Sequence, residues 1–103
     1  MEDITADEFA KLVASKKDIQ LLDVREELEF HTYNVGGLNI PLGKINHVLE
    51  EEEFIFDINE EIIVICQRGL RSKTAKTILI NAGYKNVRNL IGGLLKLQRV
   101  ISK

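Results

Sequence analysis

Cys66 is the only cysteine in this 103-residue chain, and its position favours nucleophilic chemistry. It directly follows the apolar run 62–65 and precedes Gly69 and a segment, 72–81, with helical periodicity. At the start of a helix, backbone N–H groups and the helix dipole stabilise negative charge, and the thiolate is the nucleophilic form of cysteine. The sequence therefore predicts a reactive Cys66, the alternative being an inert cysteine buried at the end of a strand.

The residues that follow Cys66 predict an anion site. The stretch 66–76 contains four basic residues and no Asp or Glu, and these are Arg68, Arg71, Lys73 and Lys76. Where a loop leads into a helix, several backbone N–H groups converge on one point, and guanidinium groups beside them add positive potential. We therefore expect this loop to attract anions.

The net charge of −2 conceals an asymmetry between the two halves of the chain. All 16 acidic residues lie within residues 1–61, whereas residues 62–103 carry nine basic residues and no acidic one. One interpretation is that the halves interleave in one fold and neutralise each other, and the other is a local attraction of anions to the Cys66 loop. The negative net charge and the aromatic content of 6% argue against nucleic acid as a partner.

Length and composition predict one compact domain, residues 1–103. One cysteine and two histidines supply neither an internal disulfide nor a set of zinc ligands. No apolar run approaches the roughly 20 residues that cross a bilayer, and the amino terminus MEDITADEF is acidic, unlike a signal peptide. We therefore expect a globular, cytoplasmic protein with no membrane as a partner.

Hydrophobic periodicity predicts alternating helices and strands. Thr5 and Glu8 have the spacing of a capping box at the start of the first helix. The predicted helices cover residues 6–16, 26–32, 44–53, 72–81 with Ala75, Ile78, Leu79 and Ala82 on one face, and a last segment with Leu94, Leu97 and Ile101 on its inner face. The predicted strands cover residues 19–24, 38–40, 62–65 and 86–90. This alternation predicts an α/β fold with a parallel sheet, and ligands of such sheets bind beyond the carboxyl ends of the strands, where Cys66 lies.

Motifs along nearly the whole chain occur in a characteristic order. They are Asp23-Val24-Arg25 with Glu29-Phe30, Val35-Gly36-Gly37-Leu38-Asn39-Ile40-Pro41-Leu42, Cys66-x-x-Gly69-x-Arg71-Ser72, and Ala82-Gly83-Tyr84 through Val87 to Gly92-Gly93. Together they resemble the rhodanese-like, single-domain sulfurtransferases. Two positions depart from the family pattern, since Gly37 stands where the family usually has Ala and Leu97 stands where it often has Trp.

The resemblance implies a three-layer α/β fold, in which a five-stranded parallel sheet has helices on both faces and its first strand lies near Asp3-Ile4. It also implies that Cys66 takes the outer sulfur of thiosulfate or of a protein persulfide, holds it as a persulfide and passes it to a thiol, cyanide or a sulfur carrier. No metal or organic cofactor is implied. The substrate-binding residues that the resemblance implies are Gln67, Arg68, Gly69, Leu70, Arg71 and Ser72, with the two arginines orienting an anionic donor. Asp23 and Arg25 are expected to have a structural role.

Two other functions stay open at this point. Related dual-specificity phosphatases build a similar loop, but theirs is Cys-x5-Arg, whereas Cys66 to Arg71 is Cys-x4-Arg. The shorter loop favours a sulfur atom over a phosphoryl group as the bound group. The second alternative is a persulfide carrier or interaction module, without turnover of small molecules, that belongs to a larger protein activating sulfur carriers.

Overall fold

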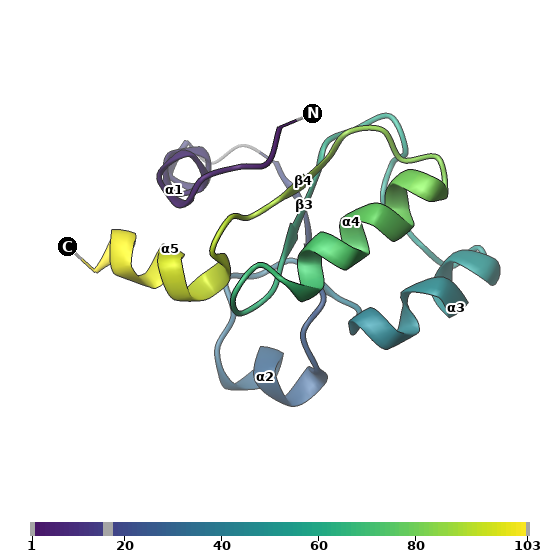
Figure 1. The fold of residues 1–103 in the computed structure, drawn as a ribbon, viewed down its shortest axis with the longest axis horizontal. Coiled ribbons are helices and arrows are strands. Elements are labelled where there is room, and N and C mark those ends of the chain that lie inside the picture. Colours follow the sequence, from purple (N-terminus) through teal and green to yellow (C-terminus); the bar gives the residue numbers. More distant parts are fainter. Residues whose placement is uncertain (1, 16–17, 103) are drawn as a thin grey trace.

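A computed structural model describes residues 2–15 and 18–102 (Figure 1). Helices and strands alternate over these residues, in the following order: α1 (Ala6–Ala14), β1 (Gln20–Asp23), α2 (Glu27–Thr32), β2 (Leu38–Asn39), a 3-10 turn (Leu42–Lys44), α3 (Ile45–Glu50), β3 (Ile62–Ile65), α4 (Arg71–Asn81), β4 (Val87–Asn89) and α5 (Gly93–Ile101). The expected α/β alternation is confirmed. The predicted helix 44–53 is divided between the 3-10 turn and α3, and residue 16 of the first predicted helix lies outside the described residues.

The sheet among the described residues has four parallel strands in the order β2-β1-β3-β4. The expectation of five strands was therefore wrong. The Asp3-Ile4 segment forms only an isolated parallel bridge, between Ile4 and Leu90. Thr5 already caps α1, so the chain turns into a helix before a strand can extend beyond Ile4.

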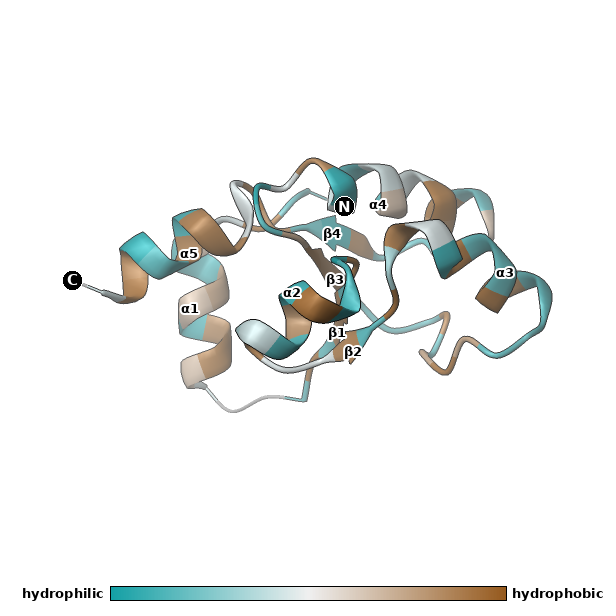
Figure 2. Cartoon of the chain, turned by 90° about the horizontal axis from the view of Figure 1, so that it is seen from below, coloured by the Kyte–Doolittle hydropathy of each residue, from teal (hydrophilic) through white to brown (hydrophobic). Residues whose placement is uncertain are grey.

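Helices cover both faces of the sheet. Successive side chains of β3 point to opposite faces, and both faces are apolar, so each must be buried by helices. Ile62 and Val64 face a core shared with α3 and α4, and Ile63 and Ile65 face a core shared with α1 and α5. Figure 1 shows α1 and α5 on one side of β3 and β4, and α3 and α4 on the opposite side. Figure 2, seen from below, shows the short helix α2 in front of the strands.

Two residues predicted to face the core are exposed instead. Ile101 is 53% exposed, because Val100, three residues after Leu97, is the side chain of the last turn of α5 that packs against the core. Ala82 is the C-cap of α4 and is exposed, while Ala75 and Leu79 are buried as expected. Ile78 packs at the margin of the core.

Both departures from the family pattern lie at packing positions. A Cβ atom added to Gly37 would come 2.6 Å from the carbonyl oxygen of Leu21, and the φ of Gly37 is +91°. Glycine therefore fits this backbone where alanine would be strained. Leu97 is 3% exposed and belongs to the core between α5 and the sheet.

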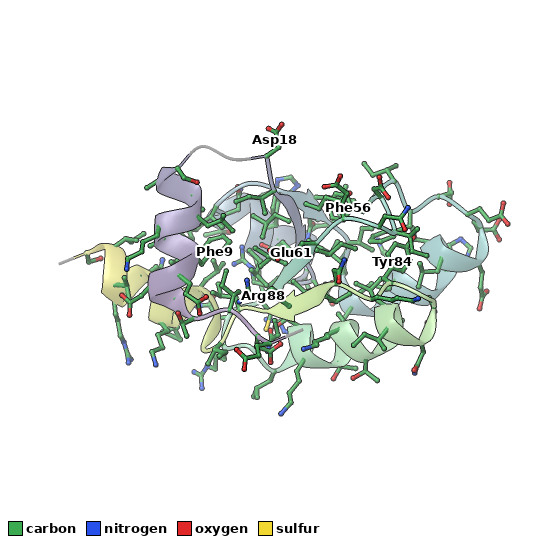
Figure 3. The ribbon with its side chains drawn as sticks, turned by 90° about the horizontal axis from the view of Figure 1, so that it is seen from above. Phe9, Asp18, Phe56, Glu61, Tyr84 and Arg88 are labelled. Carbon is green, nitrogen blue, oxygen red and sulfur yellow. The ribbon has the colours of Figure 1, made fainter. Side chains whose placement is uncertain are left out.

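Ion pairs join the acidic first half of the chain to the basic second half. Arg71 pairs with Glu29, and Lys76 pairs with Asp3. Arg88 pairs with Glu8 at 3.4 Å and with Glu61 at 3.8 Å; Figure 3 shows Arg88 and Glu61 near the middle of the molecule. These contacts support the interpretation that the two halves interleave and neutralise each other.

No helix of the part described is long and apolar enough to span a membrane. The cytoplasmic location expected from the sequence stays a prediction.

Candidate active site

The Cys66 loop leaves the carboxyl end of β3 and is held by the start of α5. The backbone N–H of Leu94 donates to the carbonyl of Cys66 at 2.9 Å, and that of Leu95 donates to the carbonyl of Gln67 at 3.0 Å. A Cβ atom at Gly93, whose φ is +62°, would come 2.5 Å from both of these carbonyl oxygens. Gly93 therefore allows the close approach of α5 that orients the loop.

Several hydrogen-bond donors converge on the sulfur of Cys66. Gly69 N–H donates to Sγ at 3.1 Å and Ser72 N–H donates at 3.4 Å, while the Ser72 hydroxyl lies 3.3 Å away. Burial by itself raises the pKa of the Cys66 thiol, but the hydrogen bonds from the Ser72 hydroxyl and from the backbone of Ser72, Arg68 and Gly69 outweigh it. The pKa of Cys66 is therefore lowered from its ordinary value, and the site favours the thiolate.

Asn89 holds the donors in place, a role that no motif in the sequence indicated. The Ser72 hydroxyl donates its one proton to Asn89 Oδ1 and shares it with the Cys66 sulfur, and Asn89 Nδ2 donates to the carbonyl of Gly69 at 3.1 Å. The side chain thus joins both residues that bond to the Cys66 sulfur. In the sequence, Asn89 could be noticed only as a polar residue near the carboxyl end of a predicted strand, between the apolar Val87 and Leu90. In the structure it is 5% exposed, and buried polar groups of this kind are hydrogen-bonded.

Cys66 lies in the wall of a pocket of about 260 Å³ although its residue is only 1% exposed. The other lining residues are Glu29, Gln67, Arg68, Leu70 and Arg71. Four of the expected binding residues, Gln67, Arg68, Leu70 and Arg71, thus surround one space with Cys66. Gly69 and Ser72 do not line this pocket, because they bond to the sulfur from within the loop.

Arg71 already holds a carboxylate. Its guanidinium donates to both oxygens of Glu29, at 2.7 and 2.9 Å. This hydrogen bond, reinforced by the charge of Arg71, lowers the pKa of Glu29 to about 2 although partial burial opposes the shift. Arg68, in contrast, is exposed and forms no ion pair with any residue that the structure describes. Glu29 was visible in the sequence only as part of a family motif, with no role of its own.

Asp23 and Arg25 have the structural role expected of them. Arg25 donates to both carboxylate oxygens of Asp23, and the two side chains are 3% and 0% exposed respectively. The Arg25 guanidinium also donates to the carbonyl of Tyr33 at 2.7 Å and to that of Glu29 at 3.4 Å. The pair therefore ties the end of β1 to α2, the helix that carries Glu29.

The fold and the motif agree with what is known of related proteins. Residues 5–99 match the model of the Rhodanese-like domain family. The chain belongs to this family.

Its relatives include sulfurtransferases and a sulfur carrier. The chain is 36% identical over 100 residues to the "Putative thiosulfate sulfurtransferase, mitochondrial" of Schizosaccharomyces pombe, an alignment that covers 85% of this chain and 69% of that protein. It is 32% identical over 93 residues to the "Putative sulfur carrier protein YrkF" of Bacillus subtilis, covering 89% of this chain but only 48% of that protein. The chain thus spans about half the length of the Bacillus relative.

Solved structures have the same fold. A rhodanese-like domain protein from Staphylococcus aureus superposes with a TM-score of 0.80 at 28% identity, covering 94% of this chain and 91% of that one. The human single-domain sulfurtransferase TSTD1 superposes with a TM-score of 0.82 at 23% identity, covering 94% and 95%. At 23% identity, the similarity to the human protein shows a shared fold alone.

Proposed function

We propose that this chain, acting as one domain over residues 1–103, is a sulfurtransferase that carries sulfane sulfur as a persulfide on Cys66. The observation that carries the proposal is the convergence of the Gly69 and Ser72 donors on the chain's one thiol, at the wall of an open pocket. The same donors stabilise either the attacking thiolate or a negatively charged persulfide sulfur, because both present a sulfur anion to the loop.

The transfer takes place in two displacements without net oxidation. The Cys66 thiolate attacks the outer sulfur of the donor, the donor's sulfur–sulfur bond breaks, and its electron pair leaves with sulfite (from thiosulfate) or with a thiolate (from a persulfide). A thiophilic acceptor then attacks the outer sulfur of the Cys66 persulfide and releases the Cys66 thiolate. Each step forms one bond to the transferred sulfur and breaks one.

Thiosulfate or a protein persulfide is the proposed donor, and a thiol, cyanide or a sulfur carrier is the proposed acceptor. The thiosulfate sulfurtransferases and the sulfur carrier protein among the relatives support these classes. The exposed Arg68, beside the Cys66 pocket, supplies positive charge for an anionic donor. The proposed mechanism needs no metal or organic cofactor.

Mass spectrometry of the intact protein tests the proposal. After exposure to thiosulfate, or to an alkyl persulfide in a separate sample, the mass should increase by one sulfur atom, and cyanide or a thiol should remove that sulfur. The Cys66→Ser variant should fold normally and gain no sulfur. A persulfide on the wild type that no acceptor removes, or undiminished transfer by the serine variant, would contradict the proposal.

A carrier without turnover is the second candidate, and the match to a protein named as a sulfur carrier favours it. Turnover distinguishes the two. An enzyme releases many equivalents of thiocyanate per molecule when thiosulfate and cyanide are in excess, whereas a carrier without turnover releases at most one, from sulfur already loaded on Cys66.

A further inference from the structure

The pair formed by Glu29 and Arg71 lies in the wall of the Cys66 pocket. Both residues line this pocket, and the guanidinium uses two of its N–H groups on the carboxylate. Such a two-point contact between a guanidinium and a carboxylate is strong and directional. An anion that enters the pocket can approach Arg68, but it must compete with Glu29 for Arg71 and it meets the negative charge of Glu29.

Glu29 is held in this position by its own helix. Its Oε1 also accepts the backbone N–H of Glu26 at 3.1 Å, which completes the capping box of α2. Arg25 fixes the same helix by donating to the backbone carbonyl of Glu29 at 3.4 Å. The carboxylate is thus oriented before any substrate arrives, and an incoming anion gains less from Arg71 than it would from a free guanidinium.

The space around the pair suits a sulfur atom on an organic chain. A second pocket of about 400 Å³ adjoins the Cys66 pocket and shares Glu29 and Gln67 with it. Leu28 and Tyr33 also line this second pocket, and they are 80% and 41% exposed. The guanidinium of Arg25, which lines it too, is already bonded to Asp23. The second pocket therefore offers apolar contact for a carbon chain and little free positive charge.

We propose that Glu29 is a specificity-determining residue that disfavours small inorganic dianions and favours sulfur presented as an alkyl persulfide, R–S–SH. The inference rests on the proposed function. Of the two proposed donor classes, thiosulfate and persulfides, it selects persulfides. A dianion such as thiosulfate meets the Glu29 carboxylate with its whole charge, whereas an alkyl persulfide carries at most one negative charge, on its outer sulfur.

The favoured step balances without an added oxidant or reductant. The Cys66 thiolate forms a bond to the outer sulfur of R–S–SH, the S–S bond of the donor breaks, and R–S⁻ leaves with the electron pair. The proton of the donor stays on the transferred sulfur or passes to the leaving thiolate. The Cys66 pocket accepts the outer sulfur, and the adjoining pocket accepts R.

The Glu29→Gln variant tests the role of the charge, because glutamine also completes a capping box. We measure the rate of Cys66 persulfide formation against the concentration of thiosulfate or of the persulfide of N-acetylcysteine methyl ester, a donor with no other charge. The half-saturating concentration of thiosulfate should fall about two- to fivefold in Glu29→Gln, the range expected when a partly exposed ion pair no longer competes. That of the alkyl persulfide should fall by less, because this donor carries at most one negative charge.

Glu27→Gln is the matched control, because Glu27 lies on the same helix but pairs with the exposed Lys44, not with Arg71. Its half-saturating concentrations should equal those of the wild type. In the double variant Glu29→Gln/Arg71→Met, the gain for thiosulfate should disappear. An unchanged thiosulfate dependence in Glu29→Gln, or the same gain in Glu27→Gln, would overturn the inference.

Alkylation of Cys66 tests the same charge effect without sulfur transfer. Iodoacetate is an anion and iodoacetamide is neutral, and both react with the same thiolate, so their rate ratio cancels any change in the Cys66 pKa. The ratio of iodoacetate to iodoacetamide rates should rise several-fold in Glu29→Gln and stay constant in Glu27→Gln. If no donor loads Cys66, the proposed function fails, and this ratio still decides whether Glu29 repels anions: an unchanged ratio refutes that role.

Discussion

Two arginine–carboxylate pairs lie close to the carboxyl ends of the central strands, and they differ in burial. The side chains of Arg25 and Asp23 are 3% and 0% exposed, whereas those of Arg71 and Glu29 are 37% and 36% exposed. Arg25 bonds to Asp23 and to two backbone carbonyls, while Arg71 bonds to Glu29 at the edge of a pocket. The same chemical pair therefore holds the fold together in one place and lines a pocket in the other.

The energetic consequences of the two pairs differ accordingly. Removing one partner of a buried ion pair leaves an uncompensated charge in a low-dielectric interior. A pair that is one-third exposed is screened by water, so that one partner can be replaced at a small cost in stability. Burial makes the first pair structural, and exposure allows Glu29 to act on specificity.

The largest effect on stability should follow from breaking the buried pair. Arg25→Met should lower the free energy of unfolding by about 3–5 kcal/mol, because the Asp23 carboxylate would remain buried without its cation. Urea denaturation measures this change. Lys44→Met is the control, because the pair of Lys44 with Glu27 has side chains that are both 64% exposed, and its loss should cost at most about 1 kcal/mol. Equal losses in the two variants would contradict the distinction drawn from burial.

The second largest effect on stability should come from the backbone contact between the Cys66 loop and the start of α5. Gly93→Ala should cost at least about 2 kcal/mol, because the residue has a positive φ and its Cβ would meet the carbonyls of Cys66 and Gln67. The loop would have to move away from α5, so sulfur loading of Cys66 should fall as well. Gly43→Ala is the control, since nothing lies within 4 Å of a Cβ at that position. A Gly93→Ala protein with normal stability and loading would show that this contact is unimportant.

Local patterns predicted those features that depend on neighbours in the sequence. The apolar run 62–65 is a buried strand with the predicted bounds, and Thr5 and Glu8 form the capping box that their spacing indicates. The Cys66 loop lies at the carboxyl end of that strand for the same local reason. The backbone donors to the sulfur, Gly69 and Ser72, follow Cys66 within six residues. The sequence could therefore predict that this loop donates hydrogen bonds to the sulfur.

Features that depend on distant contacts were missed or wrong. The role of Glu29 depends on Arg71, 42 residues away, and that of Asn89 depends on Ser72, 17 residues away. Periodicity carries no information on such pairs. The family resemblance supplied a first strand at Asp3-Ile4, but the early start of α1 leaves only a bridge there. The position of Ile101 was wrong because the choice between it and Val100 depends on how α5 packs against the core.

A third effect concerns the thiolate. Ser72→Ala removes the hydroxyl whose one proton the Cys66 sulfur shares with Asn89 Oδ1, so the pKa of the thiol should rise towards its ordinary value. The rate of iodoacetamide alkylation at neutral pH should fall by up to about tenfold, with the inflection of its pH profile moved upward. Thr77→Ala is the control, because this hydroxyl on the same helix donates to the carbonyl of Lys73 and not to Cys66. A profile identical to that of the wild type would exclude the Ser72 hydroxyl as a thiolate donor.

The smallest effect should be the contribution of Glu29 to stability, and its pH dependence separates it from the effect on specificity. The pKa of Glu29 is about 2 in the folded protein and 4.5 without its partners. Because the folded-state pKa is the lower one, the stabilisation is fully present above about pH 4.5 and is lost as the pH falls through about 2.

The exposure of the pair limits this stabilisation to about 1 kcal/mol or less. Glu29→Gln should therefore be at most slightly less stable than the wild type at pH 7, and the difference should decrease as the pH falls towards 2, the folded-state pKa of Glu29. Urea denaturation of both proteins between pH 7 and pH 2 measures it. A loss at pH 7 as large as that of Arg25→Met, or one that does not decrease in acid, would mean that Glu29 serves the fold as Asp23 does and is not an exchangeable partner of Arg71.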